Sequence, residues 1–235
     1  VDADVIILGF GGAGACAAIE AANAGARVLI LEKQPQGKLI NNTRMSGGIY
    51  HSPDPSGDRQ ALKEYAKAMF SGENIPTKLE GEQPDVSDGL AEAWAKYSPE
   101  NVDFLKKLDP AINTVAFGRF SGAAFPTFPG AKESKYQVFG SSFTKVADFN
   151  TPTMNAPKSQ KMNGEAFFTV LREGVEKRKA RILWETPAKR LVVNDKGMVS
   201  GVVGRNKAGK DVVCRARRAV IITTGGYEYN LPMRR

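Results

Sequence analysis

The glycines near the start of the chain are spaced as in a loop that binds phosphate groups. Gly9, Gly11 and Gly14 form a Gly-x-Gly-x-x-Gly pattern, with a further glycine at position 12. In such a loop the first glycine permits a tight turn, the second lets the backbone approach a pyrophosphate, and the third allows close packing of helix on strand. A helix that begins there directs its N–H groups and the positive end of its dipole at the anion. The pattern therefore predicts a dinucleotide site.

A carboxylate further along the chain narrows the choice of dinucleotide. Glu32 ends the second apolar run after the glycines. At this place a carboxylate accepts hydrogen bonds from the ribose hydroxyls. The same carboxylate would repel a 2′-phosphate, so NADP is disfavoured. NAD and FAD both remain compatible with these residues.

The segments around the glycines read as the strand, helix and strand of a βαβ unit. Residues 5–8 and 28–31 are continuous apolar runs, and residues 13–24 are rich in alanine and free of proline. Buried parallel strands have such apolar runs, and Gly25 is a common helix-ending residue. We therefore expect an α/β fold with a Rossmann-like dinucleotide-binding domain.

The rest of the chain supplies further helices and strands. Helical spacing or helix-start signals predict four more helices, in residues 58–69, 86–97, 99–108 and 162–177. Ser98, just before Pro99, is expected to cap the third of these. Alternating sequence between hairpin-type turns predicts antiparallel strands in residues 188–193, 199–205 and 211–214.

Three other stretches have a different character. Residues 219–223 resemble a separate strand of the buried type. Residues 34–57 are rich in Gly, Pro, Asn and Ser and read as a loop. Residues 116–160 combine many phenylalanines with Gly, Pro and Ser, which predicts irregular structure or short strands that pack on an apolar partner.

Composition argues against several classes of protein. The chain has 235 residues, a net charge of +8, two cysteines and one histidine. With so few ligands, neither a disulfide framework nor a metal site is indicated. Its basic clusters lack interleaved aromatic residues and a nucleic-acid motif, and an anionic ligand is a sufficient use for the positive charge. No apolar run reaches the roughly 18 residues of a membrane span. We expect a cytoplasmic protein that binds no nucleic acid and spans no membrane.

Two further motifs connect the chain to a known family. Residues 42–48 read Asn-Thr-Arg-Met-Ser-Gly-Gly, and residues 218–230 read RAVIITTGGYEYN. With the glycine loop and a Thr-Pro…Arg-Leu stretch at residues 186–191, they resemble the fumarate reductase and succinate dehydrogenase flavoprotein superfamily, which includes urocanate reductases and 3-ketosteroid dehydrogenases. The motifs occur in the family's order from residue 4 to residue 230. The resemblance implies FAD rather than NAD as the cofactor.

The resemblance also assigns cofactor-binding roles to individual residues. The pyrophosphate and adenosine ribose are assigned to Gly9, Gly11, Gly12, Ala13, Gly14, Glu32 and Lys33. The ribityl chain and isoalloxazine ring are assigned to Asn42, Thr43, Met45, Ser46, Gly47 and Gly48. The backbone near Ala188 would face the adenine, and Thr224, Gly225 and Gly226 would close over the cofactor. No residue is assigned a catalytic role.

The chain departs from the family pattern in two respects. Members with covalently attached FAD carry a histidine before the threonine, where this chain has Asn42, so non-covalent FAD is expected. Family members are also about twice as long, as a two-domain enzyme would be. In them a capping domain, catalytic Arg and His residues and a final glycine-rich segment follow. The chain is therefore expected to be the N-terminal part of an enzyme, with the C-terminal part of the same enzyme as its partner.

These expectations define a domain organisation. Residues 1–115 would form the first part of the FAD-binding domain, which carries an inserted β-layer. Residues 116–160 would be an excursion towards the capping region that binds the substrate. Residues 161–235 would be the return segment of the FAD-binding domain, truncated at its C-terminus.

The resemblance implies an FAD-dependent oxidoreductase that acts on a carbon–carbon bond next to a carbonyl or carboxylate. Hydride would pass between flavin N5 and a small carboxylate or ketone substrate. This part alone is expected to be inactive. One alternative is a non-catalytic flavin-binding or interaction module. Another is an NAD-dependent Rossmann dehydrogenase, which would share only the first glycine motif.

Residues outside the motifs are expected to have structural roles. His51 is predicted to be a surface residue rather than a catalytic one. Arg44 is predicted to form a salt bridge at the edge of the cofactor rather than to steer an anionic substrate. Tyr227 is predicted to pack near the adenine side or beneath a strand end. The phenylalanines of residues 116–160 are predicted to form capping-domain core rather than a steroid-like pocket.

Overall fold

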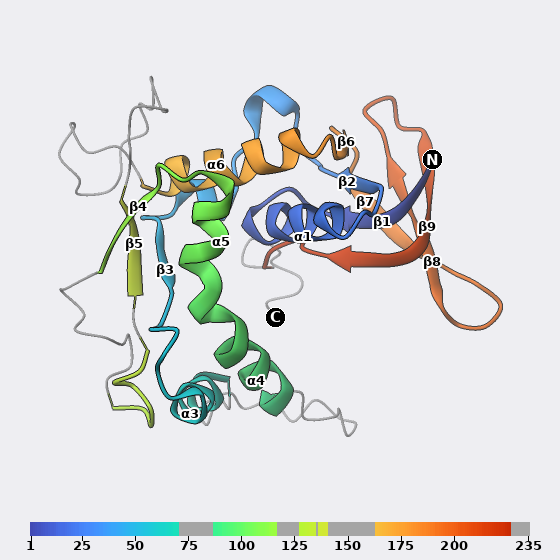
Figure 1. Cartoon of the computed structure of the whole chain (residues 1–235). Coiled ribbons are helices and arrows are strands. Elements are labelled where there is room, and N and C mark those ends of the chain that lie inside the picture. The colour runs from blue at the N-terminus through green and yellow to red at the C-terminus, as the bar shows by residue number, and fades with distance from the viewer. Residues whose placement is uncertain (71–86, 117–126, 135, 141–162, 227–235) are drawn as a thin grey trace, which may run out of the picture. The chain divides into compact units, whose positions relative to one another are not determined.

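The computed structural model describes residues 1–70, 87–116, 127–134, 136–140 and 163–226 (Figure 1). The chain divides into two compact units, one made of Val1–Ser46 and Thr151–Arg235 and the other of Gly47–Asn150. Both contain helices and strands, and the predicted α/β class is confirmed. The functional boundaries expected near residues 115 and 160 stay a prediction.

The first unit is built on a six-stranded sheet with the order β6-β2-β1-β9-β8-β7. The predicted βαβ unit is present as β1 (Asp2–Leu8), α1 (Gly12–Asn23) and β2 (Val28–Leu31). A second crossover through α6 (Asn163–Lys177) leads to β6 (Arg181–Leu183), which pairs in parallel with β2. The helices α1 and α6 lie side by side (Figure 1). This arrangement is the Rossmann-like part of the fold.

The other side of the sheet is an antiparallel meander. It consists of β7 (Ala188–Val193), β8 (Val199–Arg205) and β9 (Asp211–Ile222), which pair antiparallel in that order. The predicted strands 188–193 and 199–205 have these bounds. The turns between the strands end in Gly197 and Gly209, both with positive φ, as hairpin turns require.

The prediction of two separate strands in residues 211–223 is wrong, because β9 is continuous. Its first part, residues 211–215, pairs with β8, and from Arg215 to Ile222 it pairs in parallel with β1. Ala3 pairs with Ala216 and Val5 with Ala219, so β9 carries one extra residue between these pairs. The extra residue belongs to a β-bulge around the exposed Arg217 and Arg218. Two successive outward arginines interrupt the alternation, which made one strand read as two.

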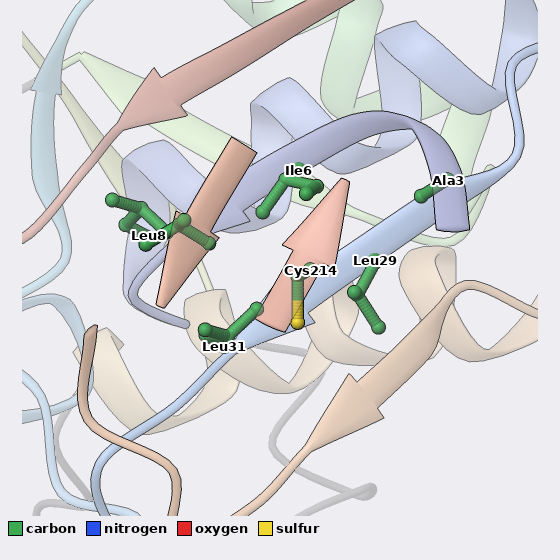
Figure 2. Close-up of a cluster of buried hydrophobic side chains, with 7 residues drawn as sticks. Ala3, Ile6, Leu8, Leu29, Leu31 and Cys214 are labelled. Atoms are coloured by element: carbon green, nitrogen blue, oxygen red, sulfur yellow. The ribbon is translucent and has the colours of Figure 1, made fainter. Parts of the chain in front are cut away.

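A core of apolar side chains is formed by the central strands of the six-stranded sheet. Figure 2 shows Ile6 and Leu8 of β1 gathered with Leu29 and Leu31 of β2 and Cys214 of β9. Successive side chains of a strand point to opposite faces. Ile7 is also fully buried, so β1 is covered on both faces. Burial on both faces explains the uninterrupted apolar runs in the sequence.

Residues 34–57 contain short elements that the loop prediction lacked. They are the 3₁₀ helix Gln36–Lys38, the four-residue helix α2 (Asn42–Met45) and the strand β3 (Ile49–His51). The strand β6 was also not predicted. Elements of three or four residues are too short to show a periodicity, so their positions are set by tertiary contacts.

The second unit has a small antiparallel sheet with the order β3-β5-β4. Its other strands are β4 (Asn113–Ala116) and β5 (Tyr136–Gly140). Three predicted helices are confirmed as α3 (Arg59–Phe70), α4 (Ser87–Tyr97) and α5 (Asn101–Leu108). Most of the phenylalanine-rich region 116–160 lies outside the described residues, so the prediction of its packing is not tested.

The predicted cap of α5 is wrong. Ser98 begins a 3₁₀ helix (Ser98–Glu100) that joins α4 to α5, and it makes no capping hydrogen bond. Its buried Oγ has no hydrogen-bond partner among the described residues. Pro99 keeps its favourable place in the first turn, but the chain arrives there already in a helical conformation, which leaves no extended cap residue.

None of the helices within the described ranges is long and apolar enough to cross a membrane.

Candidate functional site

The glycine loop joins the end of β1 to the start of α1, and the structure gives different reasons for its glycines. Gly9 has a φ of +104°, and a Cβ there would lie 2.7 Å from the Thr223 carbonyl oxygen. At Gly14 a Cβ would overlap the carbonyl oxygen of Gly9, and at Gly12 it would overlap the hydroxyl of Thr43. These three glycines are therefore required by the conformation or the packing of the protein itself.

Gly11 has no such requirement. It is the N-cap residue of α1, with a φ of −98° and a ψ of −166°, a conformation open to any residue. The nearest atom that a Cβ would meet there is the Cβ of Asn41, at 3.9 Å. Gly11 has no side chain with which to cap α1, and in the first turn the Gly12 N–H donates to the Thr43 hydroxyl. The space at Gly11 and the N–H groups of the first helical turn therefore fit an anion held by the backbone.

Glu32 lies beside this loop and is almost completely buried. Its Oε2 accepts a hydrogen bond of 2.8 Å from the Phe10 N–H inside the glycine motif. Its Oε1 accepts another of 2.8 Å from the Gln34 N–H. A carboxylate has about four acceptor positions, and these two N–H groups use two of them. Glu32 therefore orders the glycine loop, and its contact with a ribose stays a prediction.

Phe10, the second residue of the glycine motif, anchors the loop through aromatic contacts. Phe10 is buried, and its ring makes edge contacts with Phe168 of α6 and with Trp184, at centroid distances of 5.6 and 5.8 Å. The aromatic packing and the bond to Glu32 together hold the loop in place.

The residues before and within α2 contact the glycine loop directly. The Thr43 hydroxyl accepts a hydrogen bond of 3.2 Å from the Gly12 N–H. Asn41 donates from Nδ2 to the Phe10 carbonyl at 3.2 Å, and its Oδ1 accepts from the Arg44 N–H at 2.8 Å as the N-cap of α2. The structure therefore brings the second predicted cofactor motif up to the first one.

The remaining predicted residues of this motif are placed less closely. Asn42 and Met45 are exposed, and Ser46 donates from its hydroxyl to the Thr43 carbonyl at 2.8 Å. Gly47 and Gly48 open the second compact unit, so their relation to the glycine loop is a prediction only. Gly48 has a φ of +70°, which explains the glycine at that position.

The end of β9 also reaches the glycine loop. The Thr223 hydroxyl donates to the Leu8 and Gly9 carbonyls, at 2.9 and 3.2 Å. Thr224, Gly225 and Gly226 follow and are exposed, and Gly225 has a φ of +77°. The predicted residues thus begin beside the loop, while Tyr227 lies outside the described residues.

The segment before Ala188 lies beside Glu32. The Thr186 N–H donates to the Glu32 carbonyl at 2.8 Å, and the Glu185 N–H donates to the Gln34 carbonyl at 3.2 Å. Ala188 itself is half-buried at the start of β7. Lys33, next to Glu32, is exposed to solvent. This backbone lies on the side of the glycine loop that carries Glu32.

Arg44 forms the predicted salt bridge, and its partner is Glu165 in the first turn of α6. Its guanidinium also donates to the Leu39 carbonyl. The sequence did not reveal Asn41, Thr223 or Glu165 as parts of the site. For Asn41 a signal existed, since Asn is a preferred helix N-cap, but a four-residue helix gave no pattern to follow it.

His51 is half-buried, contrary to the sequence prediction of a surface residue. In the second unit its Nδ1 lies 3.3 Å from the Ser134 hydroxyl, and its ring packs edge-on against Trp94 at 5.1 Å. Burial lowers the pKa of His51 from 6.5 to about 4. The imidazole is therefore neutral near neutral pH, and its surroundings are those of a structural aromatic cluster that includes Tyr65 and Phe128.

The lowered pKa of His51 predicts a loss of stability in weak acid. The unfolded chain binds a proton near pH 6.5, whereas the folded protein does so only near pH 4. The contribution of His51 to the unfolding free energy is thus fully present above pH 6.5 and is lost as the pH falls towards 4. Because the side chain is partly exposed, the slope should stay below about 1.4 kcal/mol per pH unit. Urea unfolding from pH 7 downwards measures it.

The single histidine makes this test specific. A His51→Phe variant keeps a ring against Trp94 and has no imidazole to titrate. Its unfolding free energy should be flatter than that of the parent in the upper part of this pH range, before the carboxylates begin to titrate. Parallel curves for the two proteins would contradict the assignment.

The two cysteines lie in different elements of the first unit. Both are free thiols, Cys16 in α1 and Cys214 in β9. Burial raises the pKa of Cys16 to about 11 and also raises that of Cys214, so neither is a reactive thiolate. The described side chains contain no group of three or more potential metal ligands among His, Cys, Asp and Glu.

Comparisons with known proteins agree with this geometry. A family model described as an FAD binding domain matches residues 4–235. The 3-oxo-5-alpha-steroid 4-dehydrogenase of Comamonas testosteroni is 29% identical over 214 residues, which cover 85% of this chain and 36% of that protein. The fumarate reductase (cytochrome) of Shewanella frigidimarina is 24% identical over 228 residues, covering 97% and 34%. The chain thus spans about a third of the length of these curated relatives.

A solved structure shows the same fold. The 3-ketosteroid delta1-dehydrogenase from Sterolibacterium denitrificans has a TM-score of 0.73 at 22% identity, over 99% of this chain and 49% of that one. Its likeness supports the α/β architecture of the glycine loop and the sheet. The chain belongs to the FAD binding domain family, within the FAD-binding oxidoreductases that include ketosteroid dehydrogenases and fumarate reductases.

Proposed function

We propose that this chain is the cofactor-binding part of an FAD-dependent oxidoreductase acting on a carbon–carbon bond beside a carbonyl or carboxylate. The observation that carries the proposal is the open backbone position at Gly11, at the start of α1 and close to the buried Glu32. Neither φ nor protein packing requires a glycine there. Close approach of a pyrophosphate does.

Different residues of the chain would bind different parts of the cofactor. The N–H groups of Gly11, Ala13 and Gly14 would hold the pyrophosphate, because they lie at the positive end of α1. Glu32 would accept hydrogen bonds from the ribose hydroxyls at its two remaining acceptor positions. The residues Asn42, Thr43, Met45, Ser46, Gly47 and Gly48 would follow the flavin half.

Further residues would enclose the cofactor. The backbone near Ala188 would face the adenine, because the preceding segment pairs with the backbone of Glu32 and Gln34. Lys33 is an exposed cation that would lie near the ribose. Thr224, Gly225 and Gly226 would close over the cofactor from the end of β9.

The chemistry is proposed from the relatives and the cofactor. FAD, when bound, supplies hydride exchange at N5. The names of the relatives indicate substrates with an activating group beside the reacting bond, since fumarate carries carboxylates and a 3-oxo steroid carries a ketone. An acid or base must handle the proton on the neighbouring carbon. We assign this role to no residue of the present chain, and the further parts of the same enzyme are the proposed partner.

Asn42 supports a non-covalent mode of binding. It precedes Thr43 and is exposed at the start of α2. A carboxamide lacks the nucleophilic ring nitrogen through which a histidine forms a covalent bond to a flavin. We therefore propose that FAD dissociates intact when the protein is unfolded. As a separate part of the proposal, the enzyme works in the cytoplasm on a small carboxylate or ketone.

Titration of the purified chain with FAD tests the proposal. We expect quenching or enhancement of flavin fluorescence at a stoichiometry of one, and full release of FAD into the supernatant after acid precipitation. NAD added in excess should not compete. Binding of NAD without binding of FAD would instead support a nicotinamide-dependent dehydrogenase, and flavin retained in the precipitate would contradict non-covalent attachment.

Turnover separates an enzyme from a non-catalytic flavin-binding module. The complete product of the gene should oxidise a reduced dye with fumarate or a related unsaturated acid, or reduce a dye with a 3-oxo steroid. The present chain alone should bind FAD without turnover. A complete gene product that binds FAD and turns over none of these compounds would favour the binding module.

A further inference from the structure

The four-residue helix α2 carries proposed flavin contacts, yet it is too short to hold its own shape. Isolated helices need about 12 residues or more to be even marginally stable in water. The position of Asn42–Met45 therefore depends on what the helix is fastened to. Two separate parts of the first unit supply the fastening, the glycine loop on one side and α6 on the other.

On the side of the glycine loop, the fastening consists of neutral hydrogen bonds. They are the bond from the Gly12 N–H to the Thr43 hydroxyl and the bond from Asn41 Nδ2 to the Phe10 carbonyl, both of 3.2 Å. These lengths are at the long end of the normal range. Such bonds align α2 with the loop, but each contributes only modestly.

On the side of α6, the fastening is much closer. The Gly164 N–H donates to the Ser46 carbonyl at 3.1 Å, and a Cβ at Gly164 would overlap the carbonyl oxygens of Thr43 and Ser46. Beside this contact, the Arg44 guanidinium pairs with the carboxylate of Glu165. Glu165 is 7% exposed, so this carboxylate is taken out of water and depends on its cation.

We propose that Glu165 is a positioning residue for the flavin half of the cofactor. It acts through Arg44, which it holds against α6, and so keeps Asn42, Thr43 and Ser46 in register with the glycine loop. This role rests on the proposed binding of FAD. Glu165 lies at the start of α6, about 120 residues after Arg44. The return segment of the chain thus holds a part of the proposed site that the N-terminal segment supplies.

The adenosine half of the site has its own fastening. The glycine loop is held by Phe10 and Glu32, through contacts that involve neither Arg44 nor Glu165. ADP carries the adenosine and the pyrophosphate without the flavin. A loss of α2 position should therefore weaken FAD and leave ADP nearly unchanged, whereas a general loss of structure would weaken both.

The experiment compares FAD and ADP dissociation constants for the chain and for Glu165→Gln. We expect the FAD constant to rise about tenfold and the ADP constant to change less than about twofold. Glu176→Gln is the matched control, because Glu176 pairs with Arg172 on the same helix at 3.8 Å and is exposed. The control should alter neither constant.

A second pair of variants tests whether Glu165 acts through Arg44. In an Arg44→Gln background, adding Glu165→Gln should cause no further loss of FAD affinity, because the pair is already broken. A further loss would overturn the proposal, as would equal losses for FAD and ADP in Glu165→Gln. If Glu165→Gln does not fold, Arg44→Lys retains a positive charge beside the Glu165 carboxylate. It should still weaken the binding of FAD more than the binding of ADP. A parent chain that binds neither FAD nor ADP would refute the proposed function itself.

Discussion

Substitution of Gly14 by alanine is expected to destabilise the protein, whereas substitution of Gly11 by serine is expected to abolish tight FAD binding in a stable one. At Gly14 a Cβ would overlap the Gly9 carbonyl and lie 2.9 Å from the Thr223 hydroxyl. Backbone cannot move away there without breaking the pairing of β1 with β9. Such overpacking costs about 1–3 kcal/mol.

Gly11 should show the opposite pattern. Its extended conformation is that of an N-cap, and a serine hydroxyl there can accept a hydrogen bond from the first turn of α1. The unfolding free energy of Gly11→Ser should therefore stay level or rise. The same side chain fills the space proposed for the pyrophosphate, so the FAD dissociation constant should rise at least about tenfold.

Denaturant unfolding and FAD titration of both variants give the four values needed. Gly89→Ala in α4 is the control, since a Cβ at Gly89 meets nothing within 4 Å. It should raise the unfolding free energy by about 0.5–1 kcal/mol, the difference between Ala and Gly inside a helix, without any effect on FAD. Tight FAD binding by Gly11→Ser would show that the pyrophosphate lies elsewhere.

Replacement of Glu32 by alanine should reduce both stability and affinity. The change removes the acceptor of the buried Phe10 N–H and of the Gln34 N–H, both bonded at 2.8 Å. Loss of two bonds to a charged acceptor should lower the unfolding free energy by about 2–4 kcal/mol. FAD affinity should fall as well, because the ribose acceptor is lost and the glycine loop is less ordered.

Two further variants separate these effects. Glu20→Ala removes an exposed carboxylate of α1 that accepts a hydrogen bond from Asn23, and it should change stability by less than about 0.5 kcal/mol. Glu32→Gln retains the size of the side chain and one good acceptor, so it should give an intermediate loss. Wild-type FAD affinity in Glu32→Ala at full folding would exclude a ribose contact.

The βαβ unit and the position of the glycine loop beside Glu32 could be predicted because their signals are local. The apolar runs of β1 and β2, the alanine-rich α1 and Gly25 are each contained in a few adjacent residues. The glycine spacing and Glu32 fall at fixed offsets from those elements, so the structure places them together as expected.

The parts that could not be predicted depend on distant contacts. The strand β6 has only three residues and gains its identity from pairing with β2. The continuity of β9 becomes visible only when β1 lies beside it and the bulge absorbs Arg217 and Arg218. Asn41 and Glu165 are ordinary polar residues in the sequence, and their partners Phe10 and Arg44 lie far away along the chain.

The pairing of β1 with β9 has a consequence for the order in which the protein folds. Asp2 pairs with Arg215 and Leu8 with Ile222, so during synthesis the first strand cannot complete its pairing until the chain has been made as far as Ile222. Contacts between such distant residues make folding slow, and an apolar strand left unpaired is prone to aggregate. The strand β2 is available early as a neighbour of β1, but the other edge stays open. Refolding of the isolated chain should therefore be limited by the arrival of β9, and the glycine loop should acquire its final shape only when Thr223 reaches it.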